Sequence, residues 1–447
     1  MNMKTTIQIS DHFTFKKLFK FVLPSIVMMI ITSIYGVIDG LFISNFVGKT
    51  PFAAINLVMP LIMILGGMGF MLGTGGTALV AKIIGEKDRD KANRYFTMII
   101  MFAIILGIVL SAIGIAVIRP VSRLLGATDD MIEHCVLYGR VMLCFTTFFM
   151  LQSIFHSFLA AAEKPKLGLI ITLIAGCTNA ALDALFIVVF KWGLVGAAVA
   201  TGIGQMIGGI VPLIYFARKN SSLLKLTKTK IQIRPLLAAC ANGSSELLTN
   251  VASSIVSMLY NAQLMKYLGE NGVSAYGVLM YVQFIFIAIE IGFTMGSAPI
   301  IAYNYGAENH AELKNVFKKS MIAMGASGVI LSGLAQALAI PLAKIFVGYD
   351  AELYNLTVYA FRLFSFAFIF SGITIYSSGF FTALNNGLVS AIISFLRSLV
   401  FQVLFVFILP LLFGVDGIWW AMFATEVAAI IISTTFFIAM RKKYHYA

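Results

Sequence analysis

Runs of about twenty apolar residues recur from one end of this chain to the other, which is the length an α-helix needs to cross a bilayer. Of the 447 residues, 60% are hydrophobic and 11% are charged. A soluble chain carries about 25% charged residues. No stretch alternates with the period of two that the strands of a membrane barrel show. The sequence therefore predicts an all-α membrane protein.

Twelve transmembrane helices are expected, at residues 15–43, 53–81, 95–118, 131–160, 167–190, 194–217, 235–265, 274–304, 315–340, 353–384, 388–412 and 417–440. If both termini lie inside, 23 Lys and Arg fall in the inner segments and six in the outer ones. Because positive residues favour the cytoplasmic side, we expect a multi-pass protein of the cell membrane with both termini cytoplasmic. The net charge of +13 is then a topology signal rather than a sign of nucleic-acid binding.

The two halves of the chain resemble each other at offsets of 221–223 residues. The matches are GFMLG at 69 with GFTMG at 292, FLAAAEK at 158 with FTALNNG at 381, and WGLVG at 192 with FGVDG at 413. Because each half holds six spans, the repeat keeps its orientation across the membrane. We expect two pseudo-symmetric six-helix bundles with a central cavity: residues 1–217, a basic cytoplasmic linker at 218–234, and residues 235–447.

Four oxygen-bearing side chains are expected to share one layer of the N-terminal bundle: Asp39, Asn179, Asp183 and Thr201. At about 1.5 Å of rise per residue, Asp183 lies about 12 Å and Asp39 about 15 Å inside the span ends marked by the nearest Lys. A carboxylate at a helix centre costs about 2.5–3.5 kcal/mol, so it usually faces a cavity or a partner. Two acids that meet can share a proton, and such oxygens also suit Na⁺. We expect cation coupling here; the alternative is hydrogen bonding that only packs the helices.

Glu246 and Glu290 are further acids deep within expected spans, and Gln283 precedes Glu290 by two turns on nearly the same face. A negative charge in a cavity would suit a cationic substrate, so these three residues are the candidates for substrate binding. Structural roles are the alternative for each of them.

Glu426 and Arg397 lie near mid-depth on the last two spans, and we expect a structural salt bridge between them. Pro24 lies inside the first span, where its missing N–H permits a helix bend. The alternative is a proline near a helix start with no part in movement.

The chain resembles the multidrug and toxic compound extrusion (MATE) transporters in the order of its polar residues and its proline. These are Pro24, Asp39, Asn179, Asp183 and Thr201, with PIIAYNYGA after the eighth span. NGSSELLTN and YVQFIFIAIEIGFTMGSAPIIAYNYGA resemble the MepA-like subgroup. The resemblance implies a V-shaped pair of bundles and export of lipophilic, mostly cationic drugs coupled to protons or sodium. It implies the N-lobe cation site at the four layered residues and a bend of the first span at Pro24.

MATE members of the NorM type carry a second, C-lobe site with a Glu on the seventh span and an Asp on the tenth. Glu246 matches the Glu, but the tenth span here has no acidic residue. That departure favours coupling through the N-lobe.

The predicted function is therefore a cation-coupled antiporter that works by alternating access. We expect it to act as a monomer on small lipophilic cations among membrane lipids, with H⁺ or Na⁺ as the coupling ion and no cofactor. The sequence shows neither an ATPase motif nor a nucleophile–base pair, so we do not expect an enzyme. The alternative is a flippase for lipid-linked oligosaccharides or polysaccharides, whose phosphate would require several cavity Arg or Lys. Only Arg140, Arg362 and Arg397 lie within the spans.

Overall fold

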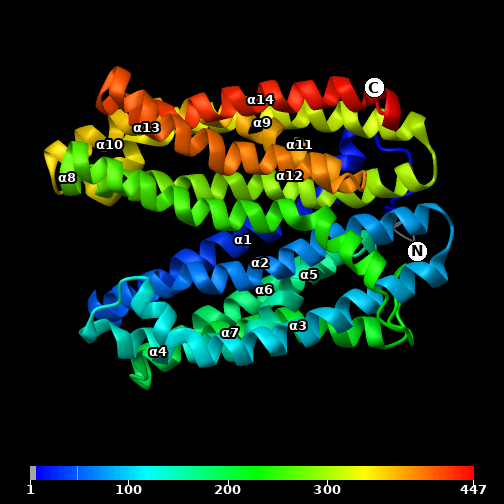
Figure 1. Cartoon of the computed structure of the whole chain (residues 1–447), viewed down its shortest axis with the longest axis horizontal. Coiled ribbons are helices and arrows are strands. Elements are labelled where there is room, and N and C mark those ends of the chain that lie inside the picture. The colour runs from blue at the N-terminus through cyan, green and yellow to red at the C-terminus, as the bar shows by residue number, and fades with distance from the viewer. Residues whose placement is uncertain (1–6, 48) are drawn as a thin grey trace, which may run out of the picture.

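The structure is a computed structural model that describes residues 7–47 and 49–447, and every regular element in those residues is helical (Figure 1). The α-helices are α1 (Phe15–Phe46), α2 (Lys49–Gly85), α3 (Arg89–Leu124), α4 (Asp129–Cys144), α5 (Thr146–Ala161), α6 (Pro165–Asp183), α7 (Gly193–Ala217), α8 (Ile233–Gly306), α9 (His310–Val347), α10 (Ala351–Phe364), α11 (Phe368–Ala383), α12 (Gly387–Phe395), α13 (Gln402–Phe413) and α14 (Val415–Tyr444). Three short turns join some of them: η1 (Ala184–Val189) and η3 (Leu396–Phe401) are π-helical, and η2 (Ser365–Ala367) is 3₁₀.

The described helices supply the twelve expected spans. Ten stretches are long and apolar enough to cross a membrane, and the bent pair of α4 and α5 makes an eleventh. The 74 residues of α8 are far too many for one crossing at about 1.5 Å per residue, and its helix is interrupted at Gly269, where φ is 62°. We therefore count α8 as two spans, a first arm at residues 233–268 and a second arm at 270–306.

Several spans are less regular than the sequence suggested. The fourth, expected as one helix over 131–160, is bent by 54° between α4 and α5. The fifth and eleventh each contain a π turn, η1 and η3. An inserted residue of this kind turns the following side chains away from the regular helical register.

The backbone turns repeat in the two halves as the sequence does. Three pairs of residues with left-handed backbone, 221 or 222 positions apart, end corresponding helices: Lys87 with Glu308, Glu163 with Asn385, and Gly193 with Gly414. The same turn at the same place in each half is what a duplicated six-helix unit would produce. An irregular stretch at residues 218–232 separates α7 from α8. The exact domain boundaries stay a prediction.

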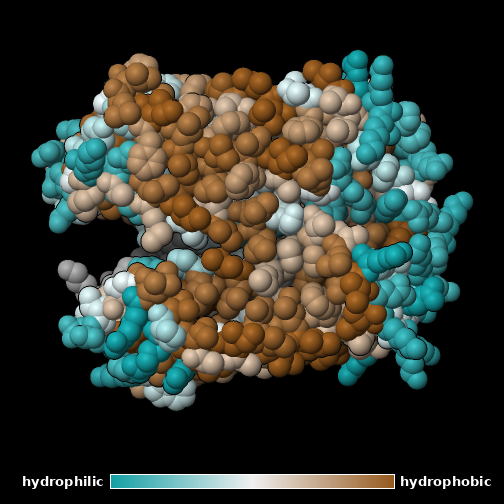
Figure 2. All heavy atoms as spheres, in the orientation of Figure 1, coloured by the Kyte–Doolittle hydropathy of each residue, from teal (hydrophilic) through white to brown (hydrophobic). Residues whose placement is uncertain are grey.

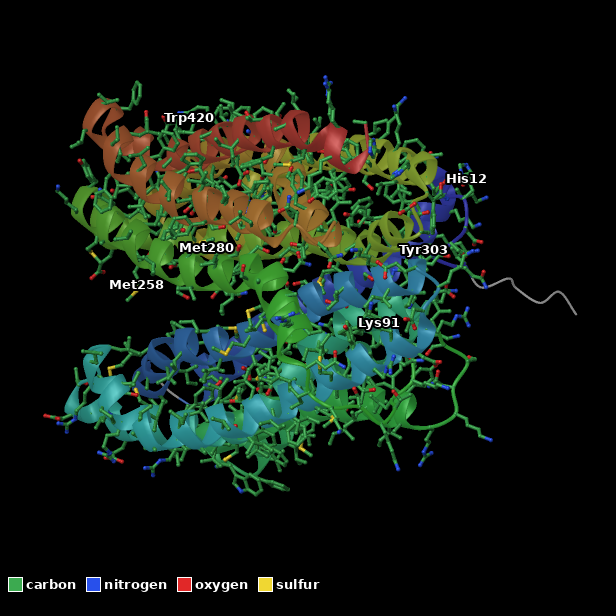
Figure 3. All side chains as sticks on the ribbon, turned by 45° about the vertical axis from the view of Figure 1, so that its right-hand side comes forward. His12, Lys91, Met258, Met280, Tyr303 and Trp420 are labelled. Carbon is green, nitrogen blue, oxygen red and sulfur yellow. The ribbon has the colours of Figure 1, made fainter. Side chains whose placement is uncertain are left out.

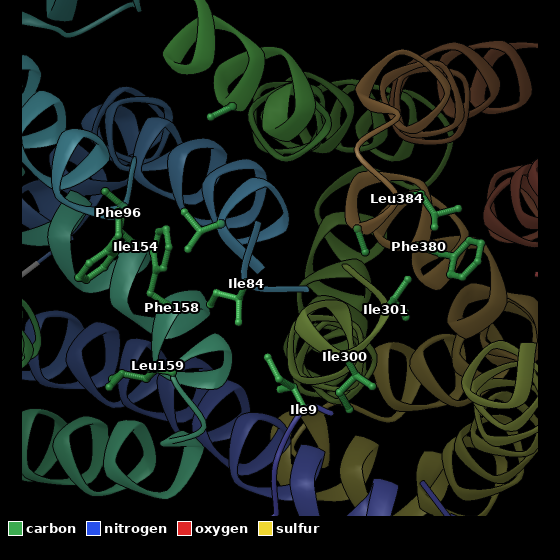
Figure 4. Packing of buried hydrophobic residues seen from close by; sticks show 14 of the residues in the cluster. Ile9, Ile84, Phe96, Ile154, Phe158, Leu159, Ile300, Ile301, Phe380 and Leu384 are labelled. Atoms are coloured by element: carbon green, nitrogen blue, oxygen red, sulfur yellow. The ribbon is translucent and has the colours of Figure 1, made fainter. Parts of the chain in front are cut away.

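Both described ends of the chain lie on one side of the molecule, which we call the terminus side (Figure 1). The largest hydrophobic cluster lies there and draws residues from both halves, including Ile84 and Phe158 from the first and Ile300 and Phe380 from the second (Figure 4). Two further large clusters each belong to one half only. On the side opposite the termini, the surface is hollowed between the halves (Figure 2). The halves therefore share a core on one side and diverge on the other.

Glycines allow the halves to meet at backbone distance on the terminus side. A Cβ atom on Gly85 of α2 would collide with the carbonyl oxygen of Tyr303, and one on Gly306 of α8 would collide with that of Lys82. Gly85 and Gly306 are partners in the sequence repeat, so equivalent helices of the two halves cross here. Small residues let membrane helices approach in this way.

The N-terminal segment bridges the two halves across the same side. The Ile9 N–H donates to Glu163 Oε1 in the first half at 2.8 Å. The Phe13 N–H donates to Glu312 Oε1 in the second half at 2.8 Å, and His12 Nδ1 lies 2.6 Å from Glu312 Oε2. Figure 3 places His12 at this end of the molecule. The segment ties the halves together where their shared core lies.

Candidate cation-coupling site

The structure places the four residues expected to couple cations together inside the N-terminal half. Asp39 lies on α1, Asn179 and Asp183 on α6, and Thr201 on α7. The exposed fractions of Asp39, Asn179 and Asp183 are 7%, 4% and 0%. Asn179 Nδ2 donates to the Thr201 hydroxyl at 3.4 Å, and that hydroxyl is within hydrogen-bonding reach of the Asp39 carboxyl group. Three helices thus contribute to one site, whose role stays a prediction.

The carboxyl groups of Asp39 and Asp183 lie close enough to interact with each other. In the described part of the chain, no donor satisfies Asp39 Oδ1 or either carboxylate oxygen of Asp183. Two ionised carboxylates repel, and each is costly to bury without a partner. A shared proton, or a cation held between the oxygens, would remove both penalties.

Tyr138 on α4 lies near this site, and the sequence did not reveal it. Its side chain is fully buried, and its hydroxyl has no hydrogen-bond partner among the described residues. It is close enough to Asp39 and Asp183 to interact electrostatically with both. A phenol there can donate to a carboxylate or accept from a protonated one. No local pattern separates it from the other tyrosines, of which the chain has 16 in all.

Two departures from regular α-helix lie beside the site. The π turn η1 follows directly after Asp183, and the bend between α4 and α5 falls at Phe145, two turns after Tyr138. π turns are frequent at functional sites. Because of the bend and the π turn, the relative directions of these side chains do not follow from helical periodicity alone.

The second half contains a buried polar cluster of its own. Arg397 donates from Nη2 to Glu426 Oε1 at 2.7 Å and from Nε at 3.0 Å, which confirms the expected salt bridge. Thr374 donates to the other oxygen of Glu426. Glu290 accepts from Ser371 at 2.7 Å and lies near enough to interact electrostatically with Arg397 and Glu426. We refer to these five residues as the C-half polar cluster.

This cluster changes the expectation for Glu290. The residue is fully buried, and its carboxyl group contacts the interior of its own half rather than the space between the halves. The repeat offset of 221 residues puts Leu404 and Val400 opposite Asp183 and Asn179, so the second half does not repeat the cation-coupling layer at those positions. The second half instead holds its buried polar groups at other positions.

Glu246 lies near the junction of the halves, where α8 meets α2. It is half-buried on the first arm of α8, on the same helical face as Gly243 and Asn250. Gly243 meets the α2 backbone at Met71, and the Asn250 side chain would lie 3.6 Å from a Cβ on Gly67 of α2. Gln283 is buried on the second arm, with 7% exposed. The structure therefore does not bring Glu246, Gln283 and Glu290 into one group.

Pro24, the expected position of a bend, lies within a continuous helix. α1 runs as a single helix from Phe15 to Phe46 with Pro24 inside it. Bending at this position stays a prediction about another state.

Known proteins resemble the chain along almost its whole length. The Multidrug export protein MepA of Staphylococcus saprophyticus is 25% identical over 420 residues, covering 92% of this chain and 91% of that protein. The outward-facing conformation of a multidrug resistance MATE family transporter of the MOP superfamily superposes with a TM-score of 0.91 at 20% identity, covering 99% of this chain and 100% of that one. A MATE in the straight conformation gives the same TM-score, identity and coverage.

The sequence profile of the MatE family matches residues 24–185 and again residues 247–408. The second match begins 223 residues after the first (247 against 24), which agrees with the internal repeat. Because the two matches together cover well over half of the sequence, this chain belongs to the MatE family of membrane transporters.

Proposed function

We propose that the protein is a cation-coupled antiporter that exports lipophilic, mostly cationic drugs across the cell membrane by alternating access. The observation that carries this proposal is the contact between the Asp39 and Asp183 carboxyl groups, buried and without a cationic partner in the described residues. Such a pair changes its preferred arrangement when a proton or Na⁺ arrives. Multidrug export by the MepA relatives supports the drug class.

The conformation fits an outward-open state. The terminus side, cytoplasmic by the positive-inside rule, is closed by the glycine crossings and the N-terminal bridge, while the opposite side is hollowed (Figure 2). In the inward-open state, the contacts at Gly85 and Glu312 must separate. A ligand drives this exchange only by binding the two states with different affinity. Protonation or Na⁺ binding at Asp39 and Asp183 supplies one such difference, and bending of α1 at Pro24 is the movement we assign to it.

The substrate binds in the opening between the halves. The first arm of α8 borders this opening and carries Met258, of which 62% is exposed, and Figure 3 places Met258 at the edge of the opening. Flexible thioether side chains adapt to varied apolar ligands. Glu246 is the acid we assign to attracting a positive charge, because it lies near the junction with α2. Glu290 is assigned instead to the interior of the second half.

A flippase for phosphate-bearing lipid-linked sugars is less well supported. Such a cargo needs available cationic side chains, yet Arg397 is committed to Glu426 in a buried ion pair. Arg140 and Arg362 are exposed and occupy equivalent positions of the sequence repeat, so each half carries only one of them.

The test is uptake of a fluorescent lipophilic cation by proteoliposomes, with pH and sodium gradients imposed separately. We expect Asp183→Asn to abolish gradient-driven uptake and to leave the protein folded. Asp130→Asn is the matched control, since it makes the same chemical change at an exposed position. Transport by Asp183→Asn at the wild-type rate under an ion gradient would sink the coupling proposal. Whichever gradient drives the wild type identifies the ion.

A further inference from the structure

A pocket with a volume of about 290 Å³ opens on the terminus side between the two halves. Lys82 of α2 and Lys91 and Tyr95 of α3 come from the first half, and Arg234 of α8 comes from the second. Figure 3 places Lys91 near the end of the molecule that carries the termini. The pocket plays no part in the proposed cation or drug sites.

The charge in this pocket is strongly unbalanced. Three basic side chains line it against one acid, Glu86, whose carboxylate lies 3.7 Å from Lys82 Nζ. The carboxylate of nearby Asp88 accepts the backbone N–H of Lys91 at 2.9 Å and so caps α3. Lys82 and Lys91 also lie over the rings of Tyr305 and Tyr95, at 5.4 and 5.9 Å. Two positive charges therefore stay without an acidic partner among the residues that line the pocket.

The start of α8 adds to this positive field. Gln232, which precedes the helix, makes no side-chain capping hydrogen bond, so the N–H groups of Ile233 and Arg234 are left without a cap, whereas Pro235 has no N–H. The start of the helix carries a partial positive charge that favours anions such as phosphate. The preceding loop is fixed against α3, because the Lys225 N–H donates to Asn93 Oδ1 and the Thr227 N–H to Thr97 Oγ1, each at 2.9 Å. The position of this helix end beside Lys91 is thus built into the fold.

We propose that this pocket binds the phosphate of an anionic phospholipid headgroup from the leaflet on the terminus side. Basic pockets between membrane helices on the cytoplasmic side recognise such headgroups. The same helix start exposes Ile233 and Leu237, at 69% and 61%, which gives acyl chains an apolar surface beside the basic one. A free phosphate ion has no apolar part that would contact this surface. Because the walls come from both halves, a bound headgroup holds the terminus side closed.

The experiment measures binding of a fluorescent short-chain phosphatidylglycerol to the full-length protein in neutral detergent. Phosphatidylcholine and inorganic phosphate serve as competitors. We expect unlabelled phosphatidylglycerol to displace the probe at concentrations at least about tenfold lower than phosphatidylcholine does. The variant Lys82→Gln/Lys91→Gln/Arg234→Gln should bind the probe at least about tenfold more weakly than the wild type.

The matched control is Lys314→Gln/Lys318→Gln/Lys442→Gln, which removes three exposed charges outside the pocket. It should retain probe affinity within about twofold. If both triple variants bound the probe equally weakly, the assignment of binding to this pocket would be overturned, because net charge alone would then attract the lipid. Displacement by inorganic phosphate at the same concentration as phosphatidylglycerol would overturn the lipid assignment. Unchanged affinity in the pocket variant would overturn the whole inference.

Discussion

In the C-half polar cluster, we expect the two partners of one salt bridge to differ in how much stability their substitution costs. It holds two acids, Glu290 and Glu426, and one base, Arg397, all buried in the second half. Substituting Arg397→Met leaves two neighbouring carboxyl groups with no positive charge between them. Substituting Glu426→Gln leaves Arg397 with Glu290 nearby to balance it.

The expected magnitudes follow from these contacts. Removing one partner of a buried ion pair costs about 3–5 kcal/mol, and Arg397→Met belongs at the upper end because both acids lose their counter-charge. In Glu426→Gln the amide oxygen still accepts from Arg397, while the amide NH₂ can donate to the Thr374 hydroxyl, which can donate to the Ser371 carbonyl. The main loss is then the charge assistance of these hydrogen bonds, about 1–2 kcal/mol. The double variant Arg397→Met/Glu426→Leu should recover most of the loss, because it leaves no orphaned charge of this pair.

The assay is a heat ramp of the purified protein in detergent with a thiol-reactive dye that reports exposure of buried Cys135, in a background in which the exposed Cys144 and Cys177 are replaced by serine. Because such unfolding is often irreversible, the order of the midpoints is read rather than absolute free energies. We expect Arg397→Met to unfold first and Glu426→Gln to fall between it and the wild type. An equal or lower midpoint for Glu426→Gln would refute the reasoning, since Glu290 would then not balance Arg397.

Two more predictions concern the terminus side. Gly85→Val forces a side chain against the Tyr303 carbonyl, so it should weaken closure of the terminus side by about 1–3 kcal/mol and slow transport. The control Gly333→Val has open space around the new side chain and should transport at the wild-type rate. Equal transport rates of the two variants in proteoliposomes would contradict this prediction. Burial raises the pKa of Glu163 above its usual value near 4.5, against the opposing Ile9 N–H. The folded state then holds the proton more tightly than the unfolded state, so this contribution to stability is full at low pH and is lost as pH rises through the raised value. Glu163→Gln keeps an acceptor for Ile9, and its unfolding midpoint should vary less from about pH 4.5 to about pH 7; an unchanged pH profile would count against this assignment.

The sequence by itself determined the membrane class, the number of spans and the duplication. These properties depend on local hydrophobic length and on order along the chain, which twelve apolar runs and a repeat of 221–223 residues carry directly. It also determined depth, because helical rise is nearly constant. That is why Asp39, Asn179, Asp183 and Thr201 could be assigned to one layer before any contact was known.

Only the tertiary structure decided which side chains meet within such a layer. Direction around a helix depends on crossing angles, on the bend at Phe145 and on the π turn after Asp183, none of which has a local sequence signal. The sequence therefore did not predict that Tyr138 lies near Asp39 and Asp183. It also did not predict that the Glu290 side chain lies near Arg397 in the interior of the second half. The depth of a residue in the membrane follows from its position along the sequence. The direction in which its side chain points around the helix axis is decided only when all the helices pack together.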